Sequence, residues 1–101
     1  MSGTLSGTLS NHKQAKLYRV RGRVQGVGFR YFVEHSAKAL AVRGWVRNLD
    51  DGSVEVYAFG TPAQLSDLAG LLWQGPRWAE VRGVDESDAV LEDHTGFSVR
   101  Q

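Results

Sequence analysis

Cysteine is absent from the sequence. Its absence excludes disulfides, a thiol nucleophile, a cysteine zinc cluster and an iron–sulfur centre. Long hydrophobic runs are absent too, since no apolar stretch approaches the roughly 18 residues that a membrane span needs. Residues 1–14 also lack the basic start and apolar stretch typical of a secretory signal. We therefore expect a cytoplasmic protein without a membrane partner.

The composition is that of an ordinary globular domain, with 101 residues of which 42% are hydrophobic and 23% charged. At this length folding buries roughly 60–70% of the unfolded surface, which is enough for one stable core without a structural metal. We expect a monomer. The first sixteen residues include a Ser-Gly-Thr-Leu repeat and little that could form a core, so they predict a flexible tail over residues 1–16 and a domain over residues 17–101.

Charge is unevenly distributed along the chain, although the net charge is only +1. Residues 17–49 carry seven basic residues and one acidic residue, whereas residues 50–101 carry three basic and ten acidic residues. Such asymmetry is typical of an anion or nucleic-acid site in the basic half. The alternative is that the two halves interleave in space and neutralise each other.

Hydrophobic periodicity predicts seven elements. These are strands at 17–24, 43–49, 53–59, 79–84 and 96–100, a helix at 29–41, and a helix that follows Thr61-Pro62 and ends at Gly75-Pro76. The first six follow the order β-α-β-β-α-β. This order predicts an α+β, ferredoxin-like split β-α-β sandwich, in which two helices cover one face of an antiparallel sheet and the other face is open to solvent.

The first strand leads through two glycines, in Gln25-Gly26-Val27-Gly28, into a helix that begins Phe29-Arg30. Glycines let successive main-chain N–H groups point into one concavity, and a helix start adds unpaired donors. A cation such as Arg30 in the first turn of a helix interacts unfavourably with the helix dipole, at a cost of roughly 0.3–1 kcal/mol. The placement makes sense if an anion lies between Arg30 and the N–H donors. The glycine spacing matches neither the dinucleotide-binding fingerprint nor the Gly-Lys-Ser/Thr loop that binds nucleoside triphosphates. A small phosphate group therefore fits best. Alternatively, the glycines only form the turn.

A second candidate is Asn48, which ends the strand at 43–49 just before the Asp51-Gly52 hairpin. An asparagine at a strand end usually closes a turn through its side chain. In the predicted topology Asn48 could face the glycine loop only by projecting across the sheet.

Three segments together closely resemble the acylphosphatase family: residues 22–32 (GRVQGVGFRYF), 44–48 (GWVRN) and 51–55 (DGSVE). The likeness continues through Gly75-Pro76 and Gly96-Phe97 and covers residues 17–101. It implies a small ferredoxin-like enzyme that hydrolyses the carboxyl–phosphate bond of acyl phosphates to a carboxylate and inorganic phosphate. No metal or cofactor is implied, and no partner beyond this small-molecule substrate and its phosphate product.

Carried over residue by residue, the resemblance also assigns the site residues. The phosphate loop falls on Gln25, Gly26, Val27, Gly28, Phe29 and Arg30. The catalytic arginine is then Arg30, and the asparagine that positions water is Asn48. Many relatives have a bulky residue in place of Gly28 and a threonine in place of Leu49, which puts the rate in doubt rather than the reaction type.

Other residues and other functions are weaker candidates. His12, His35 and His94 have neither metal-ligand spacing nor an obvious catalytic partner. The strongest alternative function is a nucleic-acid-binding module, because the RNA-recognition fold has the same order of elements. In that fold the Gly-aromatic signature lies on the third strand, whereas here the similar residues lead into the first helix, which argues against this function. A catalytically silent regulatory domain is a third class.

Overall fold

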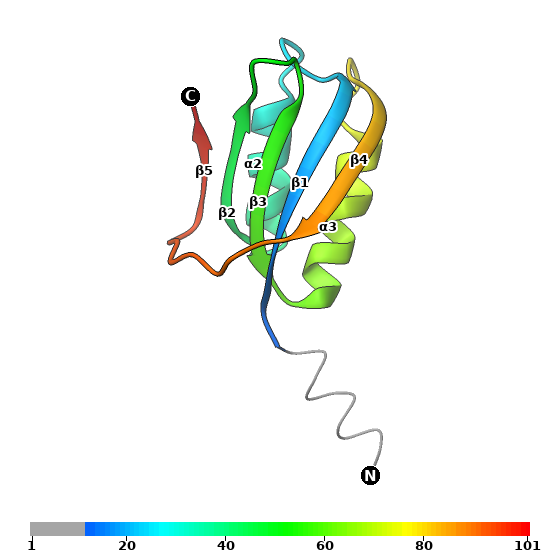
Figure 1. Ribbon diagram of the computed structural model, residues 1–101. Helices are drawn as coiled ribbons and strands as arrows, with labels where there is room; N and C mark the ends of the chain where they lie inside the picture. The colour runs from blue at the N-terminus through cyan, green and yellow to red at the C-terminus, as the bar shows by residue number, and fades with distance from the viewer. Residues whose placement is uncertain (1–11) are drawn as a thin grey trace.

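The computed structural model describes residues 12–101 and shows one five-stranded sheet covered on one face by two helices (Figure 1). In chain order the elements are β1 (Gln14–Arg23), α2 (Phe29–Ala39), β2 (Arg43–Asn48), β3 (Val54–Gly60), α3 (Pro62–Gln74), β4 (Glu80–Asp88) and β5 (Phe97–Arg100). The predicted α+β, ferredoxin-like sandwich is confirmed. Residues 1–11 of the expected tail lie outside the described residues.

The strand order across the sheet is β4-β1-β3-β2-β5. β1 and β3 are neighbours at the centre of the sheet, and β2 lies beside β3. The prediction of a wholly antiparallel sheet was wrong, because β5 pairs with β2 in parallel. Residues 89–96 carry the chain from the end of β4 across the sheet to the start of β2, where the Gly44 N–H donates to the Gly96 carbonyl at 3.0 Å (Figure 1). The last strand therefore starts where β2 starts and runs in the same direction.

Two strands extend beyond their predicted ends. β1 begins at Gln14 rather than Leu17, and β4 continues past Val84 to Asp88. Lys16 donates to Asp88 at 2.7 Å where these two extensions pair. Apart from the buried Ala15, the added residues are polar or charged, so the extensions lack the apolar alternation by which a strand is detected in a sequence. The last residues of the expected tail therefore belong to the sheet.

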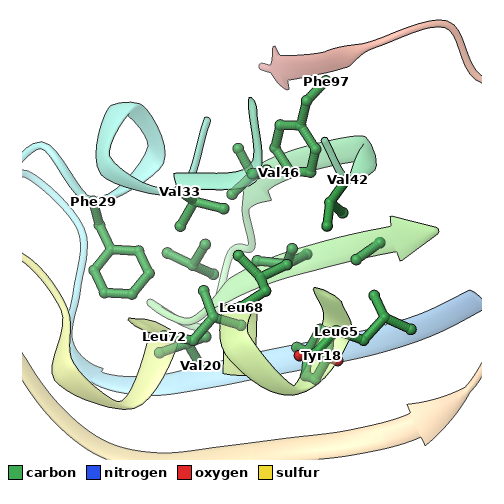
Figure 2. Close-up of a cluster of buried hydrophobic side chains, with 14 of the residues drawn as sticks. Tyr18, Val20, Phe29, Val33, Val42, Val46, Leu65, Leu68, Leu72 and Phe97 are labelled. Carbon is green, nitrogen blue, oxygen red and sulfur yellow. Dashed lines mark hydrogen bonds between the residues drawn. The ribbon is translucent and has the colours of Figure 1, made fainter. Parts of the chain in front are cut away.

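The core lies between the helices and the sheet, and Figure 2 shows its side chains meeting there. α2 contributes Phe29 and Val33, whose spacing places them on one face of the helix. The other large members come from α3 and the strands, and they include Tyr18, Val20, Val46, Leu65, Leu68 and Leu72. Phe29 is the first residue of α2 and is 2% exposed. Its burial anchors the start of the helix, and with it the end of the glycine loop.

The start of α3 has a capping box. The Thr61 side chain accepts from the Gln64 N–H, and the Gln64 side chain accepts from the Thr61 N–H at 2.8 Å. We expect Thr61→Ala to lower the free energy of unfolding by about 1 kcal/mol, since it leaves a helix donor unsatisfied. The melting temperature should then fall by roughly 4–8 °C. Thr61→Ser keeps the hydroxyl and is the control, so an equal loss in both variants would contradict the capping role.

The sheet face opposite the helices, here called the open face, is partly covered, which corrects the prediction that solvent covers it. Trp45 and Tyr57 stack at 5.8 Å between ring centroids, and both are buried. Residues 89–96 hold Tyr57 by two hydrogen bonds, since its hydroxyl donates to the Val90 carbonyl at 2.8 Å and accepts from the Glu92 N–H at 2.7 Å. The same crossing that makes β5 parallel therefore buries these two aromatic rings.

The uneven charge along the chain is largely neutralised in space. Arg21 donates to Asp85 at 2.8 Å, and this hydrogen bond holds the pKa of Asp85 below its ordinary value. Arg19 likewise pairs with Asp51. Basic residues of the first half thus meet acidic residues of the second half across the sheet. Among residues 12–101 no helix has both the length and the apolar character needed to cross a membrane.

Candidate active site

One pocket brings together the glycine loop, the start of α2 and the end of β2. Its volume is about 230 Å³, and its lining residues are Val24, Gly26, Gly28, Phe29, Arg30, Tyr31 and Asn48. Larger pockets exist elsewhere, including one of about 380 Å³ on the open face, but those described are not lined by the loop or by Asn48. We therefore place the candidate site by its chemistry and not by its size.

The loop itself presents unpaired main-chain donors. Gly26 and Gly28 have φ values of 74° and 78°, a region that side-chain-bearing residues rarely adopt. Within the described residues, the N–H groups of 26–31 have no hydrogen-bond acceptor in the protein, because they precede the first repeating bond of α2. Successive free donors beside a helix start form an anion-binding concavity.

Arg30 lies in the first turn of α2 and is half-buried. Its Nη1 donates to the main-chain carbonyl of Arg100 in β5 at 3.1 Å. No carboxylate pairs with its guanidinium in the part of the chain that the structure describes. One edge of the guanidinium thus binds a neutral carbonyl oxygen. Its positive charge remains available to bind an anionic ligand.

Asn48 ends β2 on the helix-covered face, since it follows the buried Val46 at a spacing of two residues. Its Oδ1 is buried and has no hydrogen-bond partner among the described residues. α2 packs against β2 and β5, so the glycine loop must pass over the start of β3 to reach it (Figure 1). This crossing brings the loop to Asn48, which pattern analysis could not establish.

Not every residue of the predicted phosphate loop lines the pocket. The Gln25 side chain turns away from it and donates to the carbonyls of Leu49 and Ser53, both at 2.8 Å. Val27 packs against the core. Conversely, Val24 and Tyr31 line the pocket although neither was predicted as a site residue from the sequence. Tyr31 is 68% exposed at the pocket rim. Its position next to Arg30 at the helix start is the sequence feature that could have identified it as a site residue.

The structure also locates the two departures from the family pattern. Gly28 is the N-cap of α2, and a Cβ there would meet no atom within 4 Å, so only its positive φ would oppose a larger residue. Leu49 acts through its main chain, since its N–H donates to the Ser53 carbonyl at 2.9 Å. A hydroxyl at position 49 would therefore add to a hairpin that is already closed by its main chain.

The histidines lie away from the pocket lining. His94 pairs with Glu92 and lies over the Tyr57 ring, on the open face. His12 and His35 are exposed. In residues 12–101, no group of three or more histidine, aspartate or glutamate side chains is placed to hold a metal ion.

The fold and the site define a class of protein: a small α+β sandwich with a glycine loop of unpaired N–H donors between its first strand and first helix. The acylphosphatase family model matches residues 16–99. An acylphosphatase of Solibacter usitatus is 48% identical over 96 residues, which cover 95% of this chain and 100% of that protein. One from Pasteurella multocida is 52% identical, covering 84% and 96%.

A solved structure agrees with these sequence matches. The acylphosphatase from Coxiella burnetii superimposes with a TM-score of 0.84 at 40% identity, covering 89% of this chain and 94% of that one. The chain belongs to the acylphosphatase family and is an enzyme that hydrolyses acyl phosphates.

Proposed function

We propose that the glycine loop and Arg30 bind the phosphoryl group of the acyl phosphate and that Asn48 holds the attacking water. The observation that carries this proposal is the pocket, which joins a row of free N–H donors, an arginine without a carboxylate partner and the unpartnered Oδ1 of Asn48. Among the described residues, the buried Oδ1 of Asn48 lacks a partner, and the loop donors and Arg30 have no anion of the protein to bind. A phosphate and a water molecule together complete all three.

Phosphoryl transfer is catalysed mainly by positioning and by electrostatic stabilisation. The planar guanidinium of Arg30 matches two phosphoryl oxygens, and the loop N–H groups match the third. These donors stabilise the charge that spreads over the oxygens in the transition state. Holding them in place before the reaction avoids reorganisation when the charge develops.

Asn48 is suited to hold the nucleophile because its amide can accept from a water and donate to it without carrying charge. A carboxylate in its place would be repelled by the phosphate. The water oxygen forms a bond to phosphorus while the bond from phosphorus to the acyl oxygen breaks. The electron pair of the breaking bond leaves with the carboxylate. A proton of the water passes to a phosphoryl oxygen of the substrate, which we propose as its acceptor because no acidic or imidazole side chain lines the pocket as described.

The acyl group has little room inside this pocket. At about 230 Å³, the pocket accommodates a phosphoryl group and a water, and its described rim ends at the exposed Tyr31. We therefore propose that the acyl group extends past this rim toward solvent, so that many acyl phosphates are accepted. The predicted monomeric state and cytoplasmic location stay predictions.

Activity is expected to be independent of metal ions, because cationic and N–H groups of the protein perform the charge stabilisation that a divalent cation performs in other phosphoryl-transfer enzymes. Hydrolysis of a generic acyl phosphate should proceed at the same rate before and after treatment with EDTA. A magnesium-dependent phosphatase treated in the same way is the control. Loss of turnover in EDTA, with recovery on adding magnesium, would contradict the proposed mechanism.

A further inference from the structure

The geometry points to Gln25 as a positioning residue that couples the phosphate loop to Asn48. This inference rests on the proposed function, because it concerns how the two halves of the proposed site are held in register. Gln25 belongs to the loop that follows β1, whereas Asn48 ends β2. Since β3 lies between β1 and β2, no strand pairing joins these two segments directly.

The Gln25 amide bridges both sides of the hairpin that follows Asn48. Its Nε2 donates to the Leu49 carbonyl and to the Ser53 carbonyl, each at 2.8 Å. Leu49 comes directly after Asn48, and Ser53 comes directly before Val54, the residue that pairs with Asn48 in the sheet. The two acceptors thus flank the last residue pair of β2 and β3.

The orientation of this amide is determined by its surroundings. Both acceptors are carbonyl oxygens, so only the amino group of the side chain can face them, and its two hydrogens match the two acceptors. The hairpin is in turn fixed from another side. Arg19 pairs with Asp51, and its Nε donates to the Ser53 hydroxyl at 3.2 Å. The loop is therefore tied to a hairpin that β1 also contacts through Arg19.

This connection sets the distance between the phosphoryl group and the water. The loop N–H groups and Arg30 determine where phosphorus lies, and Asn48 determines where the nucleophile lies. Small errors in that separation are costly, because attack requires the reacting atoms to be aligned near contact distance. Gln25 touches neither ligand through its side chain and acts only through the placement of these groups.

A double-mutant cycle tests the inference. Gln25→Met keeps the length of the side chain but removes both donors. We expect it to lower kcat by about 10- to 100-fold, the range in which small misplacements fall. The inhibition constant of inorganic phosphate should change much less, because the loop donors and Arg30 remain. In the Asn48→Ala background the same substitution should cost less than about threefold, since the water position that Gln25 secures is already lost.

Gln64→Met is the matched control. Gln64 is also a partly buried glutamine with a hydrogen bond to main chain, but it lies in the capping box of α3 and outside the pocket lining. This variant should lose stability and keep kcat. If Gln25→Met fails to fold, Gln25→Asn, which retains the amide on a shorter chain, is carried through the same cycle with the same expectations.

Two results would overturn the inference. One is an equal loss of kcat from the Gln25 substitution in the wild-type and Asn48→Ala backgrounds. The other is a weakening of phosphate binding as large as the loss of kcat, because Gln25 would then shape the anion loop alone. Retention of turnover in Asn48→Ala by itself would instead contradict the proposed function, so the two failures are distinguishable.

Discussion

Arg30→Ala is expected to lower kcat/KM by about 100- to 1,000-fold, which corresponds to about 2.7–4 kcal/mol of transition-state stabilisation. The reason is that Arg30 is the one cationic side chain among the described lining residues of the pocket. Inorganic phosphate keeps the three non-bridging oxygens of the transferred phosphoryl group and gains one from water. The variant should therefore also lose competitive inhibition by inorganic phosphate, measured as the inhibition constant in the same assay.

Arg30→Lys distinguishes the shape of the cation from its charge. An ammonium is a point charge and cannot hold two oxygens in the plane of a guanidinium fork, so lysine should restore little activity. Because Arg30 is only partly buried and its side chain makes one hydrogen bond to the described chain, to the Arg100 carbonyl, the fold should survive either change. Near-complete recovery in Arg30→Lys would show that charge alone suffices and would contradict bidentate binding.

Asn48→Ala is expected to lower kcat by a similar factor of about 100–1,000 while inorganic phosphate still binds. Its amide is proposed to hold water rather than phosphate, and its buried Oδ1 has no partner among the described residues. The measurement compares kcat with the phosphate inhibition constant in the same preparation. Removing an unpartnered polar group also makes a large loss of stability unexpected, so a thermal melt serves as the control for folding.

The opposite outcomes for Asn48 are equally informative. Turnover that survives in Asn48→Ala would contradict its role as the residue that holds water. An equal loss of phosphate affinity in the Arg30 and Asn48 variants would mean that Asn48 shapes the loop. The usual structural role of a strand-end asparagine would then be the better explanation.

Much of the fold was predictable because its signals are local. The capping box at Thr61 and Gln64 and the hairpin at Asp51-Gly52 depend on neighbours within a few residues. The extended end of β4 was missed because its acidic residues owe their strand conformation to pairing with β1. The parallel direction of β5 was missed for the same reason, since the path of residues 89–96 is decided by contacts with Tyr57 on the open face.

The proposed site likewise has a part that was predictable from local sequence and a part that depends on tertiary contacts. Residues 25–30 carry their own signal, because glycines with positive φ followed by a helix start produce free donors in any context that preserves the turn. Gln25 could be assigned to this loop from the resemblance, but its pattern could not tell whether its side chain faces a ligand or the protein. That choice depends on two carbonyls that lie 24 and 28 residues further along the chain.

The sequence by itself determined the order of the elements, the glycine loop with Arg30 at the helix start, and the family, because each depends on residues close together along the chain. Tertiary structure alone decided that Asn48 lies beneath that loop. α2 packs over β2 and so carries the loop across the start of β3, a consequence of how helices cover the sheet. A polar side chain at a strand end has no periodicity that reports such a neighbour, so only the packed chain could place Arg30 and Asn48 in one pocket.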